Sequence, residues 1–94
     1  MPAVTRIGDA ELPHCSGMVR AQGSGNVRAN GIGISRQGDK NTVHLLPGSP
    51  CPAHSTTISQ GSPTVLVNGK QCGRVNDPTC TKVATGSPNV SAGP

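Results

Sequence analysis

Three histidines and four cysteines are the residues of this 94-residue chain whose types and spacing point to metal chemistry. Three segments that end in Asp are each followed, within five residues, by one side chain able to bind a metal: Asp9 by His14, Asp39 by His44 and Asp77 by Cys80. If these segments are related units around one axis, the three side chains converge on that axis. Neutral imidazoles and a thiolate are typical zinc ligands.

The fourth ligand is expected from the longest segment between repeats, LLPGSPCPAHSTTISQ, which contains His54. It completes a tetrahedral His3Cys shell without an open position, so the site is structural and its binding energy contributes to folding. Cys51 lies three residues before His54 and is the alternative fourth ligand. We expect one zinc ion per chain, although such a shell also admits iron.

The remaining cysteines are interpreted as small apolar residues. Cys15 directly follows His14, and Cys72 lies in an expected hairpin strand, where a thiol packs as a buried group. A disulfide between Cys15 and Cys51 is the alternative, but a cytosolic chain disfavours it.

The sequence contains no motif for catalysis. It lacks the HExxH zinc motif, a phosphate loop ending in Lys-Ser/Thr and a Gly-x-Ser-x-Gly nucleophile, and Glu11 is its one glutamate. These are the arrangements that hydrolytic or phosphoryl-transfer chemistry commonly uses. We therefore predict that the chain is not an enzyme.

A repeated pattern supplies the elements that must position the ligands. Residues 23–39 and 61–77 both fit G-S-x-x-V-x-x-N-G-x-x-x-x-R-x-x-D without a gap. In each copy, Asn-Gly separates two short alternating runs, which is the strongest local signal for a two-residue β-hairpin. The sequence therefore predicts one hairpin in each copy.

A third copy is divided between the two ends of the chain. Residues 86–94 read GSPNVSAGP and open as the other copies do, whereas residues 1–9 read MPAVTRIGD and close as they do. We therefore predict that residues 86–92 pair with residues 2–7, which closes a threefold arrangement and leaves no free strand edge at the seam.

The Arg and Asp that close each copy are expected to be structural. They are Arg6 and Asp9, Arg36 and Asp39, and Arg74 and Asp77. An Asp of this kind caps a tight turn through hydrogen bonds to its own backbone, and the Arg pairs with it. Asn76 replaces the glycine of the other two turns and is expected to adopt the same left-handed conformation.

The composition gives the chain a poor core. Phe, Tyr and Trp are absent, hydrophobic residues make up 32%, and the chain contains 13 Gly and 9 Pro. Ordering such a backbone opposes folding strongly, so a metal, a disulfide or a partner must help to stabilise it. We expect chelation to unfold the isolated protein.

The charge and the N-terminus bear on partners and location. The net charge is +4, but the Lys and Arg residues are scattered singly and no aromatic residue can stack on a base, so nucleic acid is not an expected partner. The N-terminal MPAVTRIGDAEL does not resemble a signal peptide, and no apolar run is long enough to cross a bilayer. We therefore expect a cytoplasmic protein that is later moved by other means.

The repeats and ligands together resemble the PAAR-repeat family, the small zinc-bearing proteins at the tips of contractile injection machines. The resemblance rests on PAVTRIGD, GSGNVRANG, SRQGD, GSPTVLVNG and GSPNV with the three His and Cys80, and it covers essentially the whole chain. Only part of the Pro-Ala-Ala-Arg signature is kept, in residues 2–6, and Asn76 departs from the glycine of the other turns. The resemblance implies an all-β, conical, pseudo-threefold fold with paired termini. It also implies a zinc ion near the apex, held by His14, His44, His54 and Cys80.

The resemblance also implies a function. One copy would cap the blunt end of a trimeric β-helical spike, of the VgrG type in type VI secretion or its counterpart in phage tails, and sharpen it to pierce a membrane that it contacts transiently. Effectors are further partners of some relatives, but residues 1–94 are expected to form a single domain without an effector extension. The protein would assemble in the cytoplasm and then be secreted or injected, or remain at a virion tail tip. The base that meets the spike is expected to include Val27, Ile32, Val65 and Val67.

Two other classes remain as alternatives to a spike tip. One is a small secreted module stapled by zinc or by disulfides, which four cysteines permit. The other is a zinc-dependent nucleic-acid-binding module, which the positive charge permits.

Overall fold

The computed structural model describes residues 2–13, 17–46 and 51–93, and of residues 44–46 and 51–53 it describes the backbone alone. The strands of this part are short and pair antiparallel in twos: β1 (Arg28–Ala29) with β2 (Ile32–Gly33), β3 (His44–Leu46) with β4 (Cys51–His54), and β5 (Leu66–Val67) with β6 (Lys70–Gln71). The described residues contain no helix, so none that could cross a membrane. The predicted all-β fold is confirmed.

The two predicted Asn-Gly hairpins are present. Asn30 and Gly31 have φ of 57° and 78°, and Asn68 and Gly69 have φ of 54° and 78°. Positive φ at both central residues is the conformation that matches a two-residue turn to the right-handed twist of its strands. These turns join β1 to β2 and β5 to β6, with Ala29 opposite Ile32 in the first hairpin.

The two ends of the chain form the third unit, as predicted. Ala3 and Ser91 are antiparallel partners. Val4 N–H donates to the Val90 carbonyl at 3.0 Å, and Ala92 N–H donates to the Pro2 carbonyl at 3.0 Å. The seam between the termini is therefore closed by the same backbone pairing that closes the two continuous hairpins.

Three backbone hydrogen bonds form a closed triangle around the pseudo-threefold axis. Thr5 N–H donates to Gly73 O at 3.0 Å, Gly73 N–H to Ser35 O at 2.9 Å, and Ser35 N–H to Thr5 O at 2.9 Å. Each residue directly precedes the Arg that closes its copy of the repeat. The three units therefore bind one another cyclically through their backbones, which compensates for the small core.

The repeated serine explains why each copy opens with Gly-Ser. Ser24 Oγ accepts the Val27 N–H at 2.8 Å, while Ser62 and Ser87 do the same for the N–H groups of Val65 and Val90, both at 3.0 Å. Such side-chain to backbone bonds stabilise turns outside regular structure. The serine thus orders the bend that leads into the first strand of each unit.

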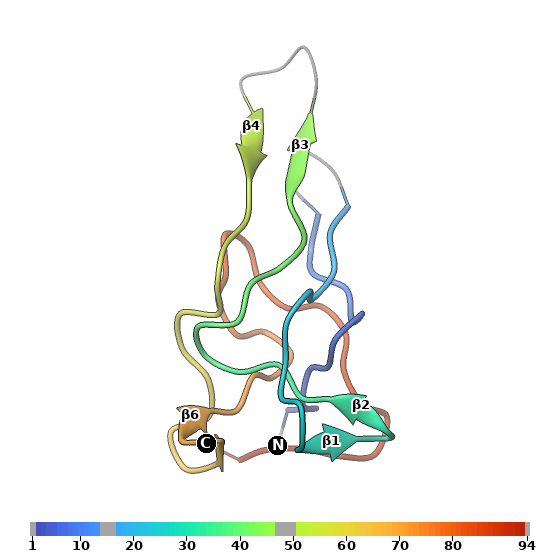
Figure 1. Cartoon of the computed structure of the whole chain (residues 1–94), viewed down its shortest axis with the longest axis vertical. Coiled ribbons are helices and arrows are strands. Elements are labelled where there is room, and N and C mark those ends of the chain that lie inside the picture. The colour runs from blue at the N-terminus through green and yellow to red at the C-terminus, as the bar shows by residue number, and fades with distance from the viewer. Residues whose placement is uncertain (1, 14–16, 47–50, 94) are drawn as a thin grey trace.

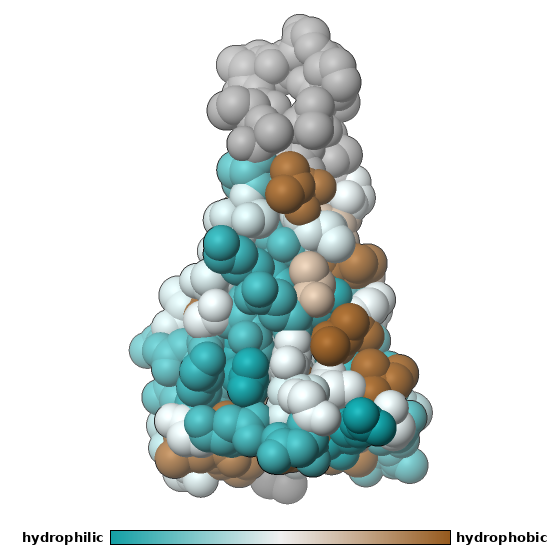
Figure 2. Space-filling view, in the orientation of Figure 1, coloured by the Kyte–Doolittle hydropathy of each residue, from teal (hydrophilic) through white to brown (hydrophobic). Residues whose placement is uncertain are grey.

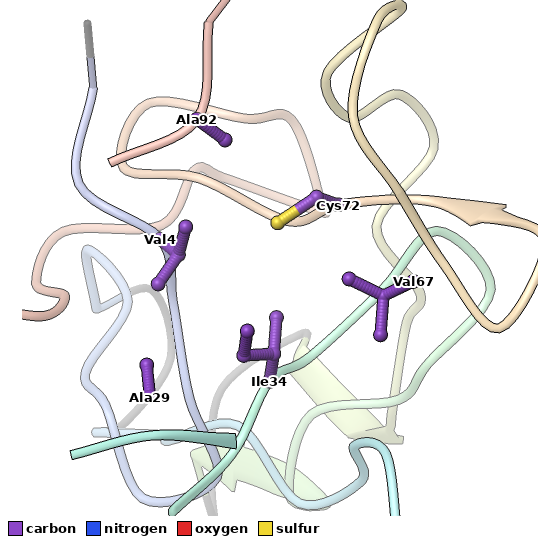
Figure 3. Close-up of a cluster of buried hydrophobic side chains, with 6 residues drawn as sticks. All are labelled: Val4, Ala29, Ile34, Val67, Cys72 and Ala92. Atoms are coloured by element: carbon purple, nitrogen blue, oxygen red, sulfur yellow. The ribbon is translucent and has the colours of Figure 1, made fainter. Parts of the chain in front are cut away.

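One cluster of buried residues in the described part of the chain consists of two sets of three equivalent residues. One set immediately precedes the residues of the backbone triangle, and the other lies two residues after the repeated valine of each copy: Val4, Ile34 and Cys72, then Ala29, Val67 and Ala92. All six are between 1% and 6% exposed. Figure 3 shows their side chains gathered within the surrounding chain. The axis is therefore filled by small aliphatic groups and one thiol.

The molecule tapers from a broad end to a narrow one (Figure 1). Its principal extents are 41, 23 and 22 Å. The hairpin β1–β2, strand β6 and both termini lie at the broad end, and β3 and β4 lie toward the narrow end. The conical, pseudo-threefold arrangement expected from the resemblance is thus the one observed, and it defines a base and an apex.

Candidate functional site

Two of the four expected metal ligands are partners across one β-ladder. His44 begins β3 and His54 ends β4, and the register places them directly opposite each other. The register shifts beyond this pair, so that Leu46 faces Cys51. Opposed positions of an antiparallel pair share one face of the ladder. The backbone therefore brings the segments of two ligands together toward the narrow end of the molecule.

Cys80, another of the expected ligands, lies beside the segment that follows His54. Its N–H donates to Thr56 Oγ1 at 3.1 Å, and its Sγ lies 3.9 Å from Asn41 Nδ2. Cys80 is half-buried and forms no disulfide. Asn41 in turn lies three residues before His44, so both contacts connect Cys80 to the arms that carry the histidine pair.

The other predicted residues of the centre fall outside what the structure describes. His14 and Cys15 lie outside the described residues, and for His44 and Cys51 the described part is the backbone. Among the described side chains, His, Cys, Asp and Glu form no group of three or more that could hold a metal. The ligand set and the Cys15–Cys51 alternative therefore stay predictions.

The residues that are described fit a zinc ion in chemistry and in placement. The half-buried thiol of Cys80 lies beside Thr56 and Asn41, which flank the strand pair that opposes His44 to His54. Nitrogen and sulfur donors of this kind are those that structural zinc sites use. The four donors belong to four separate segments, so an ion bound by them would cross-link the narrow end.

The three Arg–Asp pairs are structural forks, as expected from the repeat. Each Asp Oδ2 accepts its Arg backbone N–H at 2.7–2.8 Å. Each carboxylate also accepts two guanidinium bonds of 2.8–3.2 Å. The remaining guanidinium nitrogen of Arg6 reaches Asn30 Oδ1, that of Arg36 reaches Asn68 Oδ1, and that of Arg74 reaches the Gly93 carbonyl. Every fork thus joins one unit to the hairpin turn or strand end of another.

The forks also affect ionisation and turn geometry. The hydrogen bond to Asp9 raises the pKa of Arg6, and that to Asp39 raises the pKa of Arg36, against the lowering effect of burial. Asn76 has φ of 76°, close to the 90° and 89° of Gly8 and Gly38 in the other two turns. The predicted left-handed conformation of Asn76 is confirmed.

A fully buried ion pair is the feature that the sequence analysis missed. Arg20 Nη1 donates to Glu11 Oε2 at 2.7 Å, and both side chains are 0% exposed. Arg20 also donates to Ser35 Oγ at 3.0 Å and to the Asp39 carbonyl. One guanidinium therefore satisfies groups from two units at once.

Backbone bonds show which residues are equivalent to Arg20. Its N–H donates to Asp9 O, just as the N–H of Ile58 donates to Asp39 O and that of Val83 to Asp77 O. All three residues are at most 1% exposed. The apolar residues Ile58 and Val83 could have indicated that the equivalent position of Arg20 is buried. All three residues lie outside the repeated pattern, however, so the sequence alone does not align them.

Cys72 is a buried thiol, as predicted, and is 1% exposed. Burial, with the nearby charge of Asp77, raises its pKa to about 11, and Arg74 opposes this in part. A thiol with such a pKa stays protonated at neutral pH, and metal binding and oxidation both need the thiolate. Cys72 therefore acts as a small apolar residue on the axis.

The predicted partner-binding residues divide between core and surface. Ile32 and Val65 are each 38% exposed, Val27 is half-buried, and Val67 is 4% exposed and belongs to the core. The sequence analysis left out Val90, which is half-buried, packs on the same core, and occupies the position of Val27 and Val65 in the third copy. Val90 is the valine of GSPNV, so the repeat itself could have predicted this position. Figure 2 shows apolar residues along the broad end.

Comparison with known proteins identifies the family. The PAAR motif matches residues 7–80, which is most of the chain. No curated protein matches the chain as a relative. The matched region contains both Asn-Gly hairpins, the buried ion pair and five of the six residues of the Arg–Asp forks, all except Arg6. The chain therefore belongs to the PAAR-motif family, a structural family of spike tips in type VI secretion systems and phage tails.

Proposed function

We propose that this protein caps a trimeric β-helical spike and is held in a point by one structural zinc ion. The observation that carries the proposal is the threefold base. Val27, Val65 and Val90 occupy equivalent positions of the three copies: Val27 and Val90 pack against the core and Val65 is 38% exposed, and the three units are joined by a cyclic backbone triangle. A single chain with this symmetry can offer three similar contacts to the three chains of a trimer.

The pairing of the chain ends supports docking through the broad end. Both termini lie there (Figure 1), and their strands are satisfied by the bonds of Val4 to Val90 and of Ala92 to Pro2. The base therefore presents apolar side chains, and the paired terminal segments leave no free strand edge where they meet. Such a surface favours end-on burial against a spike over strand addition to an arbitrary partner.

Zinc suits the narrow end for a physical reason. The clustered core residues lie in the hairpin strands or next to the backbone triangle, whereas the β3–β4 pair lies toward the narrow end. A cross-link through His14, His44, His54 and Cys80 would supply the rigidity there. The ladder register, which opposes His44 to His54 and Cys51 to Leu46, supports His54 over Cys51 as a ligand.

The mechanism follows from shape and rigidity. No bond is made or broken; force is generated elsewhere in the machine and transmitted along the spike to the point. The tip would be assembled in the cytoplasm and delivered across the target membrane by that force. Both the piercing role and this route are part of the proposal.

The test is capture of the protein by a VgrG-type spike trimer from the same genome. Val65→Asp places a charge among the equivalent valines and should abolish capture. Val43→Asp is the matched control, since Val43 is 64% exposed and lies just before β3, away from the base. Equal capture of both variants would overturn docking through the base. Calorimetry of each free variant checks that the substitution has not unfolded the protein.

A further inference from the structure

Four residues that lie one to three positions from the expected ligands in sequence meet in one hydrogen-bonded network. The four residues are Glu11, Asn41, Thr56 and Thr79, here called the collar. Glu11 lies three residues before His14, Asn41 three before His44, Thr56 two after His54, and Thr79 one before Cys80. We infer that the collar positions all four ligand segments for metal binding. This inference rests on the zinc site proposed above.

Asn41 and Glu11 are the centres of the collar. Asn41 Nδ2 donates to Glu11 Oε1 and to Thr56 Oγ1, both at 3.1 Å, and Thr79 Oγ1 donates to Glu11 Oε1 at 2.7 Å. Thr56 N–H donates to Asn41 Oδ1 at 2.8 Å. A backbone N–H can only donate, so this bond fixes which end of the Asn41 amide faces the other members.

The collar reaches one proposed ligand directly. Cys80 N–H donates to Thr56 Oγ1 at 3.1 Å, and Asn41 Nδ2 lies 3.9 Å from Cys80 Sγ. The same Thr56 oxygen therefore ties the Cys80 segment to the strand that ends at His54, and Asn41 completes the link to the segment of His44.

The buried ion pair anchors the collar to the core. Glu11 Oε2 accepts Arg20, while its other oxygen accepts Asn41 and Thr79. Both carboxylate oxygens are thus used within a site that is 0% exposed. At the equivalent buried positions the other units place Ile58 and Val83, so stability alone did not require a charge here. A directional polar layer can fix the relative positions of four segments, whereas an apolar layer leaves them free to shift.

The test compares neighbouring threonines. Thr56→Val is isosteric and removes the oxygen that accepts from Cys80 and Asn41, whereas Thr57→Val makes the same change at a half-buried neighbour whose hydroxyl forms none of the collar bonds. Thr79→Val removes the bond to Glu11 and serves as a second collar variant. Glu11 itself is left intact, since its loss would leave Arg20 as an unpaired buried charge.

Zinc affinity is measured on untagged protein by competition with a chromophoric chelator. Removal of groups that orient metal ligands weakens binding roughly 10–100-fold. We expect a loss of this size in Thr56→Val and Thr79→Val, and none in Thr57→Val. With Co²⁺ as the probe, the thiolate-to-metal absorption band should shift or weaken in the two collar variants alone.

A purely structural role for the collar predicts a different result. Val83→Ala removes buried groups outside the collar and gives a variant destabilised by packing. If its zinc affinity falls as far as that of Thr56→Val at equal thermal stability, or if Thr56→Val binds as tightly as Thr57→Val, the positioning inference is overturned. A wild-type protein that binds no zinc would instead overturn the proposed metal site itself, and the inference with it.

Discussion

His44 and His54 lie directly opposite each other in the ladder that joins β3 to β4. Backbone pairing therefore brings together two residues that are ten positions apart in sequence. The metal site that we propose would use this pair as half of its shell, with Cys80 reached through Thr56. Backbone pairing therefore fixes the relative positions of two of the four residues in the proposed centre.

The metal content of ligand variants tests the proposed shell. We expect one zinc ion per chain in the wild type and a large loss in each of the four alanine variants, made at His14, His44, His54 and Cys80. A closed tetrahedral shell that loses one donor binds zinc far more weakly. Elemental analysis of untagged protein gives the readout. Cys72→Ala is the control, because this buried thiol should stay protonated and the variant should retain its zinc.

The buried ion pair predicts a large stability effect. Arg20→Met leaves Glu11 charged and without its guanidinium partner in a fully buried site, which should cost about 3–5 kcal/mol. Arg28→Met, at an exposed position of β1, should change stability by less than about 0.5 kcal/mol. Denaturant unfolding followed by circular dichroism suits a chain without Trp or Tyr.

A double variant separates the charge from the packing. Arg20→Met combined with Glu11→Met removes both charges, and it should be less destabilised than the sum of the two single variants. If instead the two single effects simply add, the pair is not coupled in the way that its 2.7 Å contact implies.

The repeat made the hairpins, the closing turns and the pairing of the termini predictable. Asn-Gly demands positive φ at both residues, and Asn30 and Asn68 have it. The fixed offset from Arg to Asp likewise predicted the three forks, since a short loop can hold both partners only in one geometry. These features are local, so spacing in the sequence is enough to specify them.

The polar interior could not be predicted in the same way. Arg20 and Glu11 each look like surface residues when read singly, and burial of both depends on contacts with Ser35 and Asn41 from another unit. The segment that forms the β3–β4 ladder contains no Asn-Gly pair, so its sequence predicts an insert that carries a ligand and gives no signal for paired strands. Both features arise from contacts between segments that no repeat aligns.

Glycine at the start of each repeat copy is required by close approach, and Gly61→Ala tests this. A Cβ at Gly61 would lie 2.4 Å from the Cys72 carbonyl oxygen, which the Ser62 N–H holds with a bond of 2.8 Å. Because the obstacle is backbone, the chain must shift, and a loss of about 1–3 kcal/mol is expected. Gly25→Ala is the matched control, since no atom lies within 4 Å of its Cβ, and it should be neutral or stabilising by about 0.4–1 kcal/mol.

Cys72 predicts a loss of stability at alkaline pH. Its pKa in the folded protein is raised to about 11, by burial first and by Asp77 second, above the 9.0 of a solvated thiol. Below pH 9 the thiol is protonated in both states, so its contribution is fully present. Between pH 9 and 11 the unfolded chain releases this proton more readily, and stability falls by about 1.4 kcal/mol per pH unit.

Cys72→Val isolates this effect from other alkaline titrations. Valine is the residue at the equivalent position 4 of the core, so the variant keeps an apolar group on the axis. The difference in unfolding free energy between wild type and variant should be constant below about pH 8.5 and then shift in favour of the variant by roughly 2–3 kcal/mol at pH 11. A difference that stays constant across this range would mean that Cys72 ionises as freely in the folded protein as in the unfolded chain, contrary to its 1% exposure.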